Sequence, residues 1–405
     1  MTPVVRRNAL LLAGGLVCNS GMFQLAAALS SLTLVAVTGV TGILGLGPAI
    51  FLGSGAAAVG PAGRLMDRVG RMPVIRGAFV VGAVGCATVS AGSHLVSAPL
   101  VALGLALVGG SGGVVQLSRA AAAEMFPLER RARGISFVLF GAVSGAIWGP
   151  VLFGPLFGGS GASAHALAWP WLLGVPFMVV GFGIASLVRP DPKEIARAHG
   201  TEPDRDGPAA PLRELLARPG VPAALVSAVA SFAVMAGVMN LAGYVAVGRG
   251  HHQGDVFQMI SVHIVGMYGL VLVVGGLIDR FGRRRALVGG LALMALSNTV
   301  LAWSASVGGM SLALLGLGLG WNFSYVAATT ELVSLTAPSE RGRLVGFSDL
   351  LSSVAAACLA LVGGVVYTAS GAVALALSAA AVAALPALWL AARTQPPPPA
   401  FAPAE

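Results

Sequence analysis

The amino-acid sequence predicts an all-α membrane protein with twelve transmembrane helices in two pseudo-symmetric six-helix bundles. Three observations predict this fold class: an apolar composition, twelve long apolar segments, and a motif that occurs twice. The residues A, V, I, L, M, F, W, Y and C make up 56% of the 405 residues, and charged residues make up 10%. Soluble domains carry about 25% charged residues, so this chain cannot cover a water-facing surface. The composition therefore excludes a soluble protein.

Twelve segments are long and apolar enough to cross a bilayer, which takes about 20 residues in a helix. A cleaved signal peptide does not explain the first of them, because its apolar run continues past residue 34. We expect helices near residues 9–36, 43–66, 73–96, 98–123, 135–158 and 168–188, and then near 221–247, 256–278, 286–305, 309–335, 345–367 and 371–392.

A polar stretch divides the chain into the domains that we expect. Residues 1–188 form the first bundle, 189–220 a cytoplasmic linker and 221–393 the second bundle. The linker contains six basic and six acidic residues, and we expect a short surface helix from Leu212 to Arg218 within it. The proline-rich tail, 394–405, is expected to be disordered.

The net charge of +9 indicates membrane topology rather than nucleic-acid binding. The arginines lie in short clusters between apolar segments, without a basic stripe interleaved with aromatic residues. With the N-terminus inside, the external loops contain only Arg249, so both termini are expected in the cytoplasm, at the inner (plasma) membrane. The three cysteines lie far apart without metal-ligand spacing, and we expect neither a metal nor a cofactor.

A nine-residue motif occurs once in each half of the chain. GRLMDRVGR at 63–71 and GGLIDRFGR at 275–283 are identical at six of nine positions. A second pair, PLER at 127–130 and PSER at 338–341, has nearly the same offset. Each pair lies between the same ordinal helices of the two halves, which predicts two parallel repeats.

These motifs resemble the loop signature G-x-L-x-D-R-x-G-R of the major facilitator superfamily of secondary transporters. The resemblance covers essentially the whole chain and implies the fold of that superfamily. The fifth expected helix contains Gly145, Gly149 and Pro150 in a pattern similar to the glycine–proline motif of the family's drug–proton antiporters. Phe153 stands where that motif usually has a glycine.

The resemblance implies that charged residues around the repeats form an inward gate and charge relay. Glu124 and Glu331 are the expected partners of the two motif arginines. Asp349 either stabilises the N-terminus of its helix or carries protons. The alternative for the set is that these charges only determine topology or lie at solvated helix ends. The expected gate residues are Asp67, Arg68, Arg71, Glu124, Asp279, Arg280, Arg283, Glu331 and Asp349.

In the resembled fold, the first, fourth, seventh and tenth helices line a central cavity. Their polar residues are expected to face substrate, and hydrogen bonds between helices are the alternative. His263 is a candidate proton carrier, because imidazole titrates near neutral pH, or else a packed histidine. Arg119 is expected to extend toward the cytoplasmic surface. The expected cavity residues are Asn19, Gln24, Gln116, Asn240, Tyr244, Trp321, Asn322 and Tyr325.

The expected function is secondary transport of a small organic solute by alternating access, as efflux with proton coupling, by a monomer. Ala106 weighs against coupling, because it stands where many such antiporters carry an arginine. The alternatives are an uptake permease or uniporter for a neutral or amphipathic molecule, and a non-transporting receptor on the same fold. The sequence contains neither a P-loop nor a catalytic cluster, so we expect no enzyme.

Overall fold

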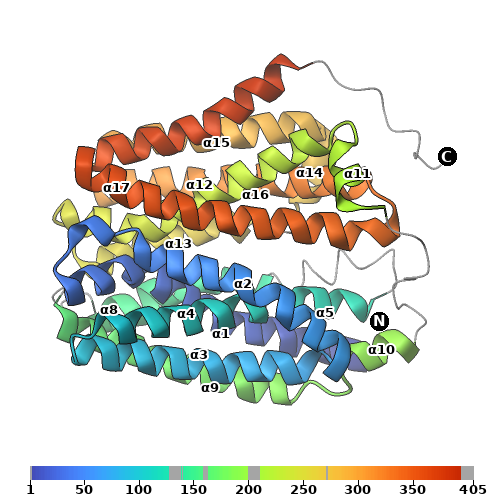
Figure 1. Cartoon of the computed structure of the whole chain (residues 1–405), viewed down its shortest axis with the longest axis horizontal. Coiled ribbons are helices and arrows are strands. Elements are labelled where there is room, and N and C mark those ends of the chain that lie inside the picture. The colour runs from blue at the N-terminus through green and yellow to red at the C-terminus, as the bar shows by residue number, and fades with distance from the viewer. Residues whose placement is uncertain are drawn as a thin grey trace.

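The computed structural model describes residues 2–126, 138, 140–157, 163–198, 210–270 and 272–393. This part of the chain is helical and contains no strand. Nine of its helices are long and apolar enough to cross a membrane. The helices lie in two layers, one above the other, with their long axes roughly parallel (Figure 1). The chain is therefore an all-α, multi-pass membrane protein, as the composition predicts.

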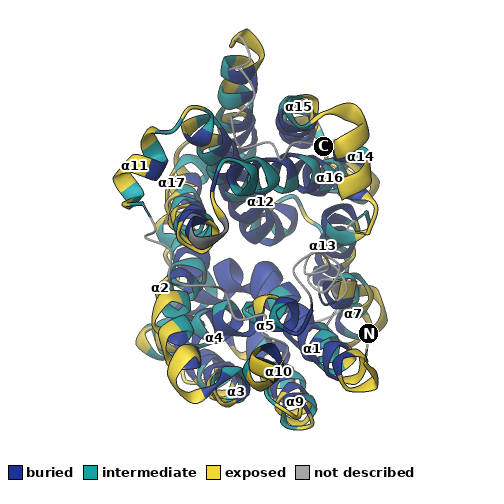
Figure 2. Ribbon diagram, turned by 90° about the vertical axis from the view of Figure 1, so that its right-hand side faces the viewer, coloured by how far each residue is buried: buried dark blue, intermediate teal, exposed yellow. Residues whose placement is uncertain are grey.

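The helices before residue 199 form the lower layer of Figure 1. Helix α3 packs against α4 and α9, and α1 packs against α9. Most residues of α1 are buried, and in the view from the end that carries both termini the exposed residues lie on the outer helices (Figure 2). The bounds are α1 Pro3–Thr38, η1 Thr41–Ile43, α2 Leu46–Val69, α3 Arg71–His94, α4 Ala98–Gln116, α5 Ser118–Glu124, α9 Ala164–Ser186 and α10 Pro192–Ala198.

The expected fifth span contains a π-helical turn. Helix α7 (Gly145–Trp148) continues into η3 (Gly149–Phe153), a π-helical turn, and then into α8 (Gly154–Phe157). Pro150 has no N–H to donate, so it interrupts the regular helical hydrogen bonds at this point. The expected span of 135–158 includes positions 135–137, 139 and 158, which lie outside the described residues.

The helices after residue 210 form the upper layer. Helix α17 contains both of the last two expected spans. The chain reverses direction between them at Gly371, whose φ is 79° and ψ is −178°. Glycine adopts such a positive φ without steric cost. The bounds are α11 Leu212–Ala217, α12 Val221–Gly248, α13 Gln253–Tyr268, α14 Val274–Phe281, α15 Arg283–Trp303, α16 Val307–Ser334 and α17 Pro338–Ala392.

Two spans that we expected to be continuous are divided. The predicted helix 256–278 consists of α13 and α14, with residues 269–273 between them. Glycines and β-branched valines are poor helix formers, and they dominate the sequence from Gly269 to Gly276. The predicted helix 98–123 is divided at Leu117, whose ψ of −11° tightens the turn between α4 and α5.

The two layers are packed together at the end away from the termini. Ser31 of α1 donates a hydrogen bond to the carbonyl of Asn240 on α12 at 3.1 Å. The backbones of α2 and α17 approach so closely that a Cβ added to Gly45 would lie 2.0 Å from the carbonyl oxygen of Ala360.

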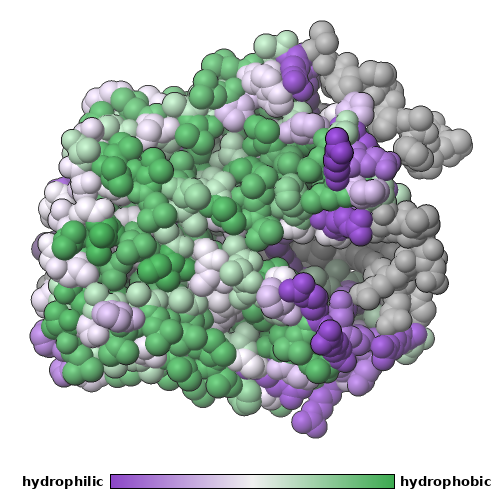
Figure 3. All heavy atoms as spheres, viewed as in Figure 1, coloured by the Kyte–Doolittle hydropathy of each residue, from purple (hydrophilic) through white to green (hydrophobic). Residues whose placement is uncertain are grey.

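The layers separate toward the other end, which carries the arginine clusters. Further along the same pair of helices, a Cβ added to Gly60 of α2 or Gly346 of α17 would meet nothing within 4 Å. The surface is hollowed between two groups of hydrophilic residues at this end (Figure 3). We call this hollow the central recess. The structure is thus packed at one end and open at the arginine-rich end.

Candidate functional site

A charged pair connects the two layers at the central recess. Arg119 of α5 lies 3.5 Å from Asp349 of α17, between Nη2 and Oδ2, and their side chains are 38% and 36% exposed. Tyr325 of α16 donates a hydrogen bond from its hydroxyl to Asp349 Oδ1 at 2.5 Å. Charged groups within membrane-spanning segments are costly and are usually functional. The pair therefore identifies the centre of the candidate site.

Aromatic rings form a wall beside this charged pair. The rings of Tyr325 and Trp321 are stacked, with centroids 5.3 Å apart and planes at 16°. Tyr268 of α13 meets Trp321 edge-on at 5.9 Å, and Phe232 of α12 lies 5.7 Å from Tyr325. The Trp321 indole nitrogen is buried and has no hydrogen-bond partner in the described part of the chain. The rings thus contact one another in the stacked and edge-on arrangements that are favourable for aromatic side chains.

Three of the expected cavity residues lie in or near this site. Trp321 and Tyr325 belong to the aromatic wall, and Gln116 is the last residue of α4, half-buried and three positions before Arg119. Asn19 is buried in α1, and neither atom of its amide has a hydrogen-bond partner among the described residues. An unpartnered amide at such depth is a polar group that a bound solute can satisfy.

The remaining four expected cavity residues contact other parts of the protein. Gln24 of α1 donates to Ser261 Oγ of α13 at 2.7 Å, which helps to close the packed end. Asn240 donates within its own helix to the carbonyl of Ala236 at 2.8 Å. The other two contact neighbouring helices: Asn322 donates to the carbonyl of Met267 on α13, and Tyr244 meets Tyr367 of α17 edge-on at 5.6 Å.

His263, the candidate proton carrier, is fully buried between α13 and α16. Its Nδ1 lies 2.7 Å from the carbonyl oxygen of Leu314, and its Nε2 has no partner within the described residues. The side chain of Asp349, in contrast, is 36% exposed.

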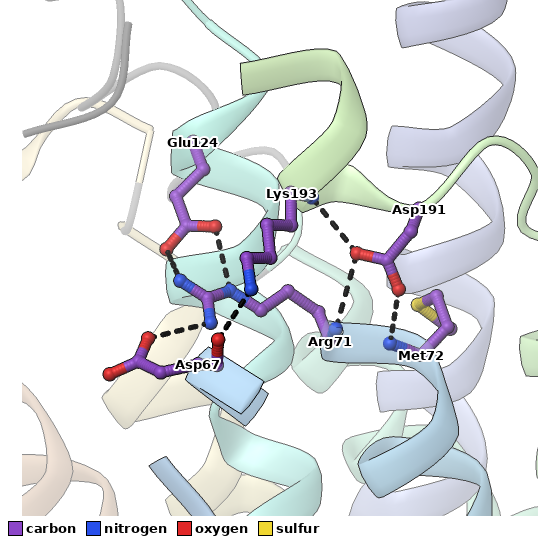
Figure 4. A network of polar contacts seen from close by, with 6 residues as sticks. All are labelled: Asp67, Arg71, Met72, Glu124, Asp191 and Lys193. Carbon is purple, nitrogen blue, oxygen red and sulfur yellow. Dashed lines mark hydrogen bonds and ion pairs between the residues drawn. The ribbon is translucent and has the colours of Figure 1, made fainter. Parts of the chain in front are cut away.

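A second site lies at the arginine-rich end of the lower layer, where α2 meets α3. The guanidinium of Arg71 forms three hydrogen bonds with two carboxylates (Figure 4). Nη1 lies 2.8 Å from Asp67, and Nε and Nη2 lie 2.9 and 2.8 Å from the two oxygens of Glu124. Arg71 is only 14% exposed. The bidentate arrangement is the strong form of an arginine–carboxylate pair.

All three residues of this cluster belong to one layer. Asp67 lies in the last turn of α2, Arg71 begins α3 and Glu124 ends α5. The cluster is formed in this structure, in which the arginine-rich end is open.

The corresponding residues of the upper layer are more loosely arranged. Arg283 Nη1 lies 3.3 Å from Glu331 and 2.8 Å from Ser334 Oγ, and Arg283 is 41% exposed. Asp279 and Arg280, at the end of α14, are exposed, as is Arg68 in the lower layer.

The glycines of the expected antiporter motif bring helices close together. Gly149 lies against Gln24 of α1 and Phe257 of α13, where an added Cβ would be 2.3 Å from Gln24 Nε2 and 2.6 Å from the carbonyl of Phe257. Gly145 begins α7, and Pro150 is exposed in the π-helical turn. The motif thus connects the two layers near the packed end.

Two features of these sites were not predicted from the sequence. We expected Arg119 to extend to the membrane surface, and it faces a carboxylate 230 positions away instead. The linker residues Asp191 and Lys193 contact the motif loop. The sequence did contain a signal for the linker helix, because an aspartate before Pro192 and Glu194 is typical of a helix N-terminus.

Twelve expected spans, a recess between two layers and repeated loop clusters define a multi-pass membrane carrier. The family model of the Major Facilitator Superfamily matches residues 10–275 and 250–405. The chain belongs to this superfamily of transporters.

Two relatives are similar over most of their length. The chain is 31% identical over 319 residues to the riboflavin transporter RfnT of Brucella anthropi, covering 77% of this chain and 76% of the relative. It is 29% identical over 348 residues to the MFS-type transporter YdeG of Bacillus subtilis, covering 84% and 80%. These relatives support the superfamily and do not indicate the drug–proton antiporter branch.

Solved structures confirm the fold. The inward open xylose transporter XylE from E. coli superimposes with a TM-score of 0.75 at 14% identity, covering 96% of both chains. A D-xylose-proton symporter also gives 0.75 at 16% identity, covering 95% of this chain and 97% of the other. At such identities the likeness establishes the fold alone.

Proposed function

We propose that this transporter moves a small organic solute with a flat aromatic ring system by alternating access. The observation that supports this most directly is the aromatic wall of Trp321, Tyr325 and Tyr268 beside the Arg119–Asp349 pair. The wall supplies stacking surface, and the pair supplies donors and acceptors for polar atoms at the edge of a ring. The relative named as a riboflavin transporter supports this solute class, because the flavin ring system is flat and has polar edges.

In the proposed cycle, the bundles 1–188 and 221–393 rock against each other, with 189–220 as the linker. The arginine-rich end is cytoplasmic, in the inner membrane, because arginine clusters remain on that side. The recess closes there when α2 and α17 approach, as they already do at the packed end. We infer that the repeated charge clusters support the two sides of this cytoplasmic gate.

Asp349 is the proposed site of proton coupling. It is 36% exposed and contacts both Arg119 and Tyr325, whereas His263 is buried against a carbonyl. Protonation would remove the negative charge that attracts Arg119, and so weaken the contact between the layers. A proton can then change the balance between the two states of the carrier.

We propose efflux as the direction, on the basis of the glycine–proline motif at Gly145, Gly149 and Pro150. Uptake is the opposite direction of the same cycle and is the competing proposal. Flux in vesicles of defined orientation distinguishes the two directions. Proton-coupled efflux predicts that solute accumulates inside inside-out vesicles when the vesicle interior is made acidic.

The test of the solute class uses riboflavin as a fluorescent probe with purified protein in proteoliposomes. Trp321→Ala should weaken apparent affinity at least about fivefold, because stacking a ring is worth roughly 1–3 kcal/mol. Trp303→Ala is the matched control, since Trp303 is 66% exposed at the end of α15. If neither riboflavin nor other flat aromatic compounds bind, the proposed solute class is wrong.

The coupling part of the proposal is tested in the same vesicles. Asp349→Asn should abolish the response of flux to a pH gradient while leaving solute exchange at equal pH. His263→Gln should leave that response in place. A pH response that survives Asp349→Asn would contradict the assignment of Asp349.

A further inference from the structure

We propose that two linker residues, Asp191 and Lys193, position the motif loop of the first half and thereby hold Arg71 between its two carboxylates. The functional part of this inference rests on the gate proposed above. Its structural part does not.

Helix α2 ends at Val69 and α3 begins at Arg71, so Gly70 alone forms the connection. Gly70 has a φ of 99° and a ψ of 167°. Such a tight connection leaves the last carbonyls of α2 and the first N–H groups of α3 without partners in their own helices. Groups from elsewhere must satisfy them.

The linker supplies partners for both helix ends (Figure 4). Asp191 Oδ1 accepts a hydrogen bond from the backbone N–H of Arg71 at 3.1 Å, and Oδ2 accepts from Met72 at 2.8 Å. Lys193 Nζ donates to the backbone carbonyl of Asp67. An acidic group at a helix N-terminus and a cation at a C-terminus are both favoured by the helix dipole. We call these two residues the linker clamp.

The clamp is itself fixed to the first half. Asp191 also accepts from the backbone N–H of Lys193 at 2.9 Å, so one carboxylate binds the first turns of both α3 and α10. Asn8 of α1 donates to the carbonyl of Pro190 at 3.1 Å, and Ile195 of α10 is buried. The clamp is therefore part of the packed structure of this half.

The second half provides a natural comparison. Gly282 forms the same turn with a φ of 88°, but a Cβ added there would meet nothing within 4 Å, whereas one at Gly70 would lie 3.0 Å from Asp191 Oδ2. Among the described residues no side chain lies against Gly282 as Asp191 does against Gly70, and Arg283 is more exposed and lies 3.3 Å from its glutamate. The clamp thus accompanies the tighter of the two clusters.

The first experiment is a double-mutant cycle between Asp191→Asn and Arg71→Lys, read by thermal unfolding in detergent. The side-chain amide of asparagine retains one acceptor oxygen, but it places N–H groups where the second carboxylate oxygen accepts from the backbone N–H groups of α3. We expect each change to lower the unfolding temperature, and the double variant to lose clearly less than the sum. Additive losses would overturn the inference. Glu194→Gln is the matched comparison, because it removes an acidic charge from the exposed side of the first turn of α10; it should lower the temperature less than Asp191→Asn and show no coupling to Arg71→Lys.

The second experiment measures flux and conformation. Asp191→Asn should lower the maximal rate about fivefold with little change in KM, and Lys193→Gln should act in the same direction. Spin labels at Gly63 and Gly346, which have open space around them, should show a longer mean distance in Asp191→Asn. If Arg71→Lys alters flux and Asp191→Asn does not, the inference is overturned while the proposed gate stands. If the cycle shows coupling but neither variant alters flux, the gate proposal fails and the clamp remains.

Discussion

The same nine-residue motif occurs in both halves of the molecule, but its arginine lies in different surroundings. Arg71 is 14% exposed and forms bonds with two carboxylates, whereas Arg283 is 41% exposed and pairs with one glutamate and a serine hydroxyl. In the first half, the linker holds the turn before the arginine. In the second, the residue after the arginine, Arg284, donates to the carbonyl of Leu390 at the end of α17.

This difference shows that the repeated motif specifies the turn and the charged residues, but does not determine how buried its arginine is or how many carboxylates the arginine contacts. Those properties depend on which other residues pack beside the turn. We therefore expect the Arg71 cluster to contribute more to the free energy of unfolding than the Arg283 cluster, although the two motifs are alike in sequence.

The largest expected effect is that of Arg71→Lys compared with Arg283→Lys. Lysine keeps the charge but loses the planar fork, so Arg71→Lys should destabilise the protein by about 2 kcal/mol. Arg283→Lys should cost less than about 1 kcal/mol, because its pair is more exposed. Thermal unfolding of purified variants measures both, and equal losses would break the comparison.

A smaller effect is expected for the two motif aspartates. Asp67 is 39% exposed, so Asp67→Asn should cost about 1 kcal/mol, which is about a fivefold change in an equilibrium constant. If this cost falls on the closed cytoplasmic gate, transport slows while solute affinity is retained. Asp279→Asn should act in the same direction but more weakly. Initial rates and binding in parallel would test this, and a larger effect of Asp279→Asn would reverse the proposed ranking.

The smallest expected effect concerns the link between α15 and α17. Arg284→Gln removes a cation near the C-terminus of α17, and we expect a loss of about 0.5 kcal/mol because the site is largely solvated. Added salt should reduce the difference from wild type, since exposed charges are screened. A salt-independent loss would indicate a packing role instead.

Much of the fold could be predicted from sequence. Apolar length and the repeat predicted an all-helical membrane protein, and the turns at Gly70, Gly282 and Gly371 lie within a few residues of the expected span ends. The break between α13 and α14 was missed, because an apolar window does not detect lost helical hydrogen bonds. The assignment of residues 1–188 and 221–393 to separate moving bundles remains a prediction.

The site was less predictable, since it depends on helix tilt and on contacts distant in sequence. Glu124 was expected beside Arg71 and lies there. Asp349 was considered for its own helix, but no local pattern relates it to Arg119. Gln24 and Tyr244 were expected in the cavity by helix number, yet each contacts a neighbouring helix because helix number does not determine which face a residue occupies.

Lys193 is the one lysine in the chain, and its ammonium group donates to the carbonyl of Asp67. The molecule therefore offers amine-reactive reagents a single side chain, located at the turn between α2 and α3. The rate at which an amine-reactive reagent labels Lys193 should report how often the ammonium group leaves the carbonyl of Asp67, without any engineered residue.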